Sequence, residues 1–228
     1  MKIGLAFSAG KDSLACLFLN KDRLNDVIVI WVNTGKNYPE TLAIVKMARD
    51  MCHYFVEIIV DRDAQNNVNG IPADVVPIAF TKIGQQFSGK KDITIQPYIS
   101  CCYENIGSHL HNAALDLGIT HLIRGQRNDE SHKSTAQNGT VIDGITYLHP
   151  IENWTKEQVL GYVAQHIELP QHFSFNHTSL DCYDCTAFTK ESTDRIAYTK
   201  KYHPRFYAEY AARKAKVDES INQALNGV

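Results

Sequence analysis

Apolar runs alternate with helical patterns over the first sixty residues. Ile3–Phe7, Val27–Val32 and Tyr54–Val60 are almost continuously apolar, which predicts strands buried on both faces. Between them, Leu14–Leu19 and Pro39–Met51 predict helices, the second with proline in its first turn. This alternation predicts a doubly wound, mostly parallel α/β sheet with helices packed against it.

Beyond residue 60 the pattern is weaker but still predicts individual elements. A capping box at Thr155 and Gln158 predicts a helix that runs to about His166. The other expectations are a loop at Asn66–Gly70, a short helix at Ile78–Phe87, a helix at Glu104–Leu117 ending at Gly118, a core strand at Thr120–Ile123, a strand or hairpin at Val141–Leu148, irregular structure at 167–188, and helices from Thr189 to about Leu225 broken near Pro204. We expect a main domain over residues 1–188 and a helical C-terminal extension over 189–228.

The composition of the chain limits its possible functions but does not identify one. The chain has 228 residues, 44% hydrophobic and 21% charged, and a net charge of −2, so no broad attraction to nucleic acid is expected. Its N-terminal apolar run is too short for a signal peptide, and no apolar stretch is long enough for a membrane span. We therefore expect a cytoplasmic protein, in which the presence of six cysteines favours a metal or redox site over disulfides.

The loop after the first strand predicts a phosphate site. Its residues are Ser8, Ala9, Gly10, Lys11, Asp12 and Ser13. A strand delivers them to a helix N-terminus, where backbone N–H groups lack partners and the helix dipole is positive. The serines offer hydroxyl donors and Lys11 a positive charge, but the sequence is not a Walker A loop. The alternative is an ordinary strand-to-helix turn.

Arg124, Gly125 and Arg127 follow another predicted core strand. Ligands bind at the carboxyl ends of strands in open α/β sheets, and guanidinium groups bind sulfate or phosphate bidentately. Ser131 could add a further donor. These residues predict an oxyanion site, with a solvated charged loop as the alternative.

Four cysteines form two pairs, Cys101 with Cys102 and Cys182 with Cys185. Four thiolates from two distant segments can bind a metal ion or a [4Fe–4S] cluster. A structural or redox dithiol is the third possibility. Cys16 and Cys52 lie on predicted helices and are interpreted as small buried hydrophobic residues.

Two motifs resemble known families. Residues Ser8–Ser13 resemble the Ser-Gly-Gly-Lys-Asp-Ser pyrophosphate (PP) loop of the adenine-nucleotide α-hydrolase superfamily, with Ala9 replacing a glycine, so the φ of Ala9 should be negative or only mildly strained. Asn33, Thr34 and Gly35 resemble an Asp-Thr-Gly segment that lies near the nucleotide in that superfamily.

Three further segments narrow the resemblance to the phosphoadenosine-phosphosulfate (PAPS) reductase family. Gly125, Arg127 and Ser131 match its Gly-x-Arg-x-x-x-Ser motif, and 149–155 its Pro-Ile-x-x-Trp-Thr segment. The four cysteines are similar to the [4Fe–4S] ligands of its iron–sulfur members, which favours that cluster over zinc. The basic pair that follows Cys-Cys in those members is missing here.

The resemblance implies a sulfur-metabolism enzyme that binds ATP, adenylyl sulfate (APS) or PAPS, with Lys11, Asp12 and Arg127 as catalytic residues. Partners would be a thioredoxin-like reductant or a sulfur donor, and a homo-oligomer is expected. The family's nucleophilic cysteine lies in a C-terminal motif, and this sequence has no cysteine after Cys185. An ATP pyrophosphatase that uses Mg²⁺ and activates nucleic acid or a small molecule for thiolation is therefore the second hypothesis. A non-catalytic nucleotide- or cluster-binding module is the third.

Overall fold

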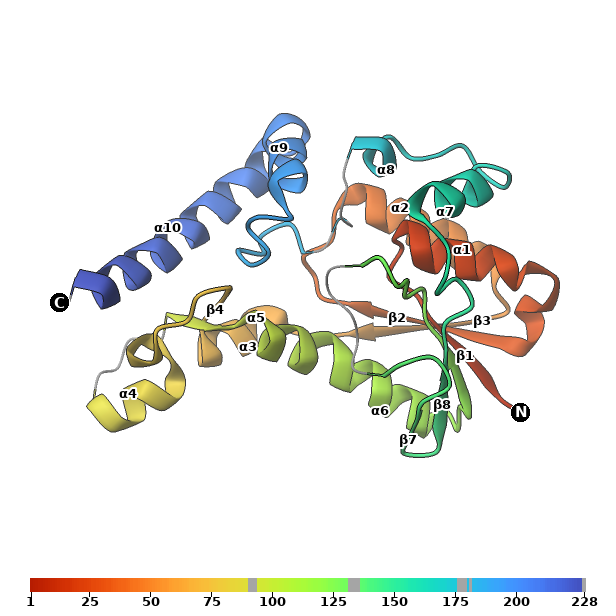
Figure 1. Cartoon of the computed structure of the whole chain (residues 1–228), viewed down its shortest axis with the longest axis horizontal. Coiled ribbons are helices and arrows are strands. Elements are labelled where there is room, and N and C mark those ends of the chain that lie inside the picture. Colours follow the sequence, from red (N-terminus) through yellow and green to blue (C-terminus); the bar gives the residue numbers. More distant parts are fainter. Residues whose placement is uncertain (90–93, 131–135, 176–179, 181, 227–228) are drawn as a thin grey trace. The chain divides into compact units, whose positions relative to one another are not determined.

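The computed structural model, shown in Figure 1, describes residues 1–89, 94–130, 136–175, 180 and 182–226. Contacts divide the chain into two compact units. The first unit contains residues 1–33, 39–59 and 108–174, and the second contains 34–38, 60–107 and 175–228. The boundary expected between residues 188 and 189 stays a prediction.

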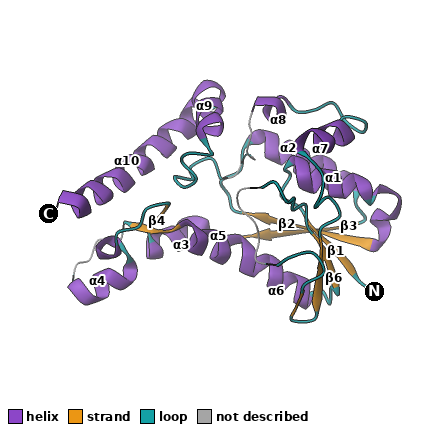
Figure 2. Ribbon diagram, viewed as in Figure 1, coloured by secondary structure: helices purple, strands orange, loops and turns teal. Residues whose placement is uncertain are grey.

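A six-stranded sheet forms the centre of the first unit (Figure 2). Its strand order is β3-β2-β1-β6-β8-β7, and every pair is parallel except the β7–β8 hairpin. The bounds are β1 Ile3–Ala6, β2 Val27–Asn33, β3 Tyr54–Ile59, β6 His121–Ile123, β7 Val141–Ile142 and β8 Ile145–Leu148. This arrangement confirms the predicted α/β fold class.

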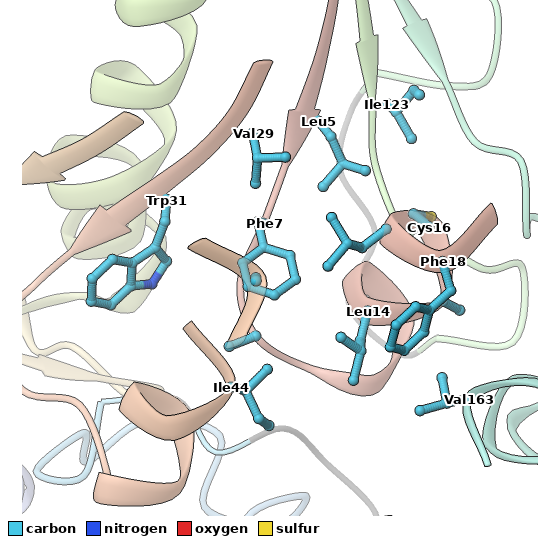
Figure 3. Close-up of a cluster of buried hydrophobic side chains, with 14 of the residues drawn as sticks. Leu5, Phe7, Leu14, Cys16, Phe18, Val29, Trp31, Ile44, Ile123 and Val163 are labelled. Carbon is cyan, nitrogen blue, oxygen red and sulfur yellow. The ribbon is translucent and has the colours of Figure 1, made fainter. Parts of the chain in front are cut away.

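Alternate residues of the strands point to two separate hydrophobic cores. Leu5 and Val29 belong to the core that α1, α2 and α7 share with one face of the sheet, and Figure 3 shows part of this cluster. Ile28 and Ile30 belong to the core on the other face, where α6 contributes Ala114. The helices of this unit are α1 Lys11–Leu19, α2 Pro39–Met51, α6 Ser108–Asp116, α7 Lys156–Val163 and α8 Gln171–Phe175, with the 3-10 segment η1 Lys21–Asp26.

The second unit contains helices and a two-stranded parallel sheet, β4-β5. Its small core joins Ala73 and Ile95 of this sheet to Val217 of α10. The elements are α3 Arg62–Asn69, β4 Ile71–Ala73, η2 Ile78–Phe80, α4 Lys82–Ser88, β5 Ile95–Pro97, α5 Tyr98–Cys102, the π-helical turn η3 Tyr103–Gly107, α9 Thr193–Tyr202 and α10 Pro204–Asn226. The predicted helix break at Pro204 is confirmed.

The loop expected at Asn66–Gly70 is wrong, because Arg62–Asn69 is helical. The helix was not predicted because its residues are mostly polar. Its N-terminus is capped by the Asp61 side chain, which accepts from the Ala64 N–H at 2.9 Å. Gly70 ends it with φ 99°, a conformation that favours glycine. The chain thereby turns into β4 beside the backbone of Ile95.

Two smaller expectations also needed correction. Strand β3 is partly exposed because it lies at the sheet edge, so it is not buried on both faces. The helix expected at Ile78–Phe87 is divided at Thr81, whose side chain caps α4.

Among the described residues, none of the helices combines the length and the apolar character that a bilayer span requires.

Candidate nucleotide site and cysteine site

The loop Ser8–Ser13 leaves β1 and forms the first turn of α1, as expected. Gly10 is the N-cap residue, and no side chain caps the helix. Within the loop, the Gly10 N–H donates to Ser8 Oγ at 3.3 Å, and the Ser13 hydroxyl donates to the Gly10 carbonyl at 3.0 Å. Both hydroxyls thus hold the loop in shape, while the N-terminal end of α1 is left for an anion.

Ala9 adopts a positive φ of 61° and is buried. The sequence left open a negative φ or a mildly strained one, and the structure has the second. A side chain in this left-handed conformation costs roughly 1–2 kcal/mol. The alanine therefore keeps the backbone shape that glycine adopts easily, at a modest cost in stability.

Asp12 connects two cations beside this loop. Its Oδ2 lies 2.9 Å from Lys11 Nζ, and its Oδ1 accepts from Arg127 Nε at 2.6 Å. All three side chains are at least nine-tenths buried. Arg127 also pairs with Asp129. Burial alone lowers the pKa of Arg127, but the negative charges of Asp12 and Asp129 outweigh it, so the pKa is raised and the side chain stays cationic.

Gly125 allows the segment after β6 to reach the loop. A Cβ atom on Gly125 would lie 2.6 Å from the Asp12 carbonyl carbon and 2.7 Å from the Ser13 nitrogen. Both are backbone atoms that cannot yield easily. The absence of a side chain at this position lets Arg127 reach Asp12.

The two segments flank the point where the strand order reverses. β1 precedes the phosphate loop, β6 precedes the arginine segment, and these strands are neighbours in the sheet. Helices cross to opposite faces on the two sides of such a point, which leaves a crevice outside the carboxyl ends of the strands. The structure therefore brings together Ser8–Ser13 and Arg124–Arg127 where α/β proteins bind ligands.

Other predicted residues of this site have different positions. Arg124 is half-buried, and burial lowers its pKa against the opposing charges of Tyr147 and Glu130. The Asn33 amide donates to Glu57 of β3 at 2.7 Å. Ser131 lies outside the described residues. Thr34 and Gly35 belong to the second unit, so their contact with a nucleotide stays a prediction.

The cysteines of the second unit lie around one arginine that the sequence did not single out. Cys182, Cys101 and Cys185 all interact electrostatically with Arg62 of α3. Cys182 Sγ lies 3.4 Å from Thr34 Oγ1. Cys101 and Cys102 lie within α5.

The cysteines are not arranged as a metal site in the part of the chain that the structure describes. Burial, followed by the charge of Cys182, raises the pKa of the Cys185 thiol to about 12. None of the six cysteines, all of which lie in the described part of the chain, forms a disulfide. Among the residues described, no group of three or more His, Cys, Asp or Glu side chains is arranged to hold a metal ion.

Two further residues near these sites also escaped the sequence analysis. Asp184 lies between Cys182 and Cys185 and pairs with Arg62, but in sequence it is only one of 25 acidic residues. Glu130 accepts from the Arg127 backbone N–H at 3.4 Å, and burial, followed by the charge of Asp12, raises its pKa. Their positions depend on contacts between distant segments.

Residues 2–188 match the family model for the phosphoadenosine phosphosulfate reductase domain. The chain belongs to this family. Among solved structures, the PAPS reductase of Candida auris, determined as a phosphate complex, is 15% identical with a TM-score of 0.53, over 82% of this chain and 83% of that one. A predicted subunit of a tRNA methyltransferase from Methanocaldococcus jannaschii is 15% identical with a TM-score of 0.42, over 91% of both chains. No curated protein sequence matches the chain.

Membership of the PAPS reductase family agrees with the fold and with the two segments at the switch point. The family resemblance inferred from the motifs is thereby confirmed. At 15% identity the Candida auris structure supports the fold alone.

Proposed function

We propose that this PAPS reductase family member is an enzyme that binds an adenine sulfonucleotide, APS or PAPS, in the first unit. The observation that carries the proposal is the buried chain of Lys11, Asp12 and Arg127, which links the phosphate loop to the segment after β6. Two cations sharing one carboxylate, beside an uncapped helix N-terminus, form a site suited to an oxyanion.

Each residue of this site has a chemical task in the proposal. N–H groups in the first turn of α1 bind phosphate oxygens, and Lys11 adds a compact positive charge. Arg127 binds the sulfate or phosphate through its guanidinium, and Asp12 positions both cations. Sulfonucleotide reduction also needs a thiolate that attacks the substrate sulfur. We assign this thiol to a thioredoxin-like partner.

We further propose that Cys101, Cys102, Cys182 and Cys185 bind a [4Fe–4S] cluster, with zinc as the alternative. The donor chemistry suits either, because four cysteine thiols come from two segments of the second unit and none of them forms a disulfide. A bound cluster would supply an anionic, redox-capable centre and would connect α5 with the segment 182–185. The residues of this chain provide its ligands and its surrounding charges.

ATP cleavage with adenylation of an acceptor is the second candidate. Its support is the pair Lys11 and Asp12 in the loop, which matches the PP-loop sequence of ATP pyrophosphatases. Mg²⁺ would then accompany the nucleotide, and a sulfur donor would displace AMP from an activated nucleic acid or small molecule. The two candidates use the same phosphate site with different leaving groups.

Two product assays on the anaerobically purified full chain distinguish these reactions. Sulfite released from APS or PAPS in the presence of thioredoxin supports the first, and pyrophosphate released from ATP with Mg²⁺ supports the second. Arg127→Gln should abolish whichever activity is found, while Arg23→Gln, at an exposed arginine of the same unit, should not. Nucleotide binding without either product would support the non-catalytic module instead.

The remaining parts of the proposal concern the setting of the enzyme. We propose a cytoplasmic homo-oligomer. A thioredoxin variant that lacks its second active-site cysteine should accumulate an S-sulfonate on the first, with release of the nucleotide, and mass spectrometry of that variant would test for the partner. Light scattering would give the oligomeric state.

A further inference from the structure

Arg62 is a buried cation next to the cysteine segments. Its side chain is 2% exposed, and its Nη1 lies 2.5 Å from Asp184 Oδ1, which is equally buried. Asp184 lies between Cys182 and Cys185. An arginine is rarely buried this deeply without compensating negative charge. The charged groups around Arg62 therefore indicate which kind of ligand the second unit could bind.

One carboxylate serves two guanidinium groups here. Arg213 of α10 also approaches Asp184, with its Nε 3.4 Å from Oδ2. Two positive charges against one negative charge leave a positive excess beside the thiols. Negatively charged sulfur atoms are thus a natural counterpart of the excess charge.

The same network extends to the other cysteine segment. Arg213 Nη2 donates to Asn66 Oδ1 at 2.8 Å, and Asn66 Nδ2 donates to Cys101 Sγ at 3.7 Å. Asn105 Nδ2 donates to the same sulfur at 3.6 Å. Hydrogen bonds to cysteine sulfur and nearby charge both set the properties of thiolate-bound centres. Asn66 and Asn105 thus contact Cys101, and Arg213 links Asn66 to Asp184, which lies between Cys182 and Cys185 in the sequence.

We infer that Arg62, supported by Arg213, is the positioning cation that holds an anionic four-thiolate centre in the second unit. This inference rests on the proposed cysteine centre. A [4Fe–4S]²⁺ core or a zinc ion with four thiolates carries a net charge of about −2. Arg62 stabilises that charge, while Asp184 holds Arg62 in place and opposes the centre electrostatically.

The sign of this effect separates an electrostatic role from a structural one. Arg62→Gln removes a positive charge and should release metal several-fold faster, while Asp184 keeps Arg213 as a partner. Asp184→Asn removes a negative charge, so it should release metal no faster than wild type. If the ion pair only supports the fold, both substitutions should accelerate metal loss.

The test uses the full chain, purified and reconstituted without oxygen. Iron, sulfide and zinc contents are measured first, and then the rate of metal transfer to a chelator. Arg62→Lys should remain close to wild type because it keeps the charge. Arg205→Gln, at an exposed arginine of α10, is the matched control and should not change the rate.

The possible outcomes separate the two proposals. A wild-type chain that holds neither iron nor zinc after reconstitution overturns the cysteine centre and this inference together. Metal in the wild type, with equal rates in all variants or with faster loss in Asp184→Asn as well, overturns the role of Arg62 alone. If Arg62→Gln fails to fold, faster loss in Asp184→Asn still contradicts the inference, and unchanged or slower loss supports it.

Discussion

Asp12 is the residue through which the two sequence motifs of the first unit meet. Its carboxylate contacts Lys11 within the phosphate loop and Arg127 from a segment more than a hundred residues away. A nucleotide phosphate would compete with this carboxylate for the same cations. The free protein thus holds both side chains oriented before ligand arrives, which reduces the entropic cost of binding.

A pair of glycine substitutions tests the close approach of the two segments. Gly125→Ala should lower the free energy of unfolding by about 1–3 kcal/mol, because its Cβ would collide with the backbone of Asp12 and Ser13. Gly161→Ala is the control, since no atom lies within 4 Å of its Cβ position in α7, and it should be neutral or stabilising. Urea denaturation measures both; equal values would contradict the predicted collision.

Cys16 and Cys52 should be unreactive in the native protein. Burial, followed by the charge of Asp12, raises the pKa of the Cys16 thiol to about 12, and burial raises the pKa of Cys52 to about 11. At pH 8 both therefore remain almost wholly protonated, and the thiolate is the reactive form. Mass spectrometry after brief alkylation should find both unmodified unless the chain is first denatured. Rapid native alkylation of Cys16 would reopen its interpretation as a structural residue.

At the scale of single elements, local signals in the sequence identified some helices well. The capping box of α7 is present, with the Thr155 hydroxyl accepting from the Gln158 N–H at 3.3 Å and the Gln158 side chain accepting from the Thr155 N–H at 2.8 Å. This helix packs against α1, as Figure 1 shows, so its stability bears on the phosphate loop.

Thr155→Ala should therefore lower the free energy of unfolding by about 1 kcal/mol. Thr155→Ser keeps the capping oxygen and should remain close to wild type. Chemical denaturation followed by circular dichroism measures both. A Thr155→Ala variant as stable as Thr155→Ser would show that the cap does not contribute.

Elements built on distant contacts were harder to predict. Helix α3 has a polar sequence without a clear apolar stripe, because its inward-facing residues are Arg62 and Asn66. Arg213 of α10 binds Asn66 and Asp184, both of which are distant from it in the sequence. Phe206 likewise stacks on Tyr183 with ring centroids 3.9 Å apart.

For the whole molecule, hydrophobic patterning was sufficient to predict a parallel sheet, and the sequence motifs were sufficient to predict the family. Apolar runs predicted the buried strands of a mostly parallel sheet, but they did not predict the order of those strands. The interleaving of the two units could not be predicted, because each unit is assembled from segments that are not adjacent in the sequence. For the same reason the sequence suggested four cysteines but not the charges around them.

The affinity of the chain for nucleotides is the most direct test of the proposed sulfonucleotide site. Calorimetric titration of the full chain with APS should show one site, and Lys11→Gln and Arg127→Gln should each weaken binding roughly ten- to a hundredfold, the value of a charged hydrogen bond. Arg23→Gln should bind like wild type. Unchanged affinity in a folded Arg127→Gln variant, or no binding of APS, PAPS or ATP by the wild type, would contradict the proposed nucleotide site.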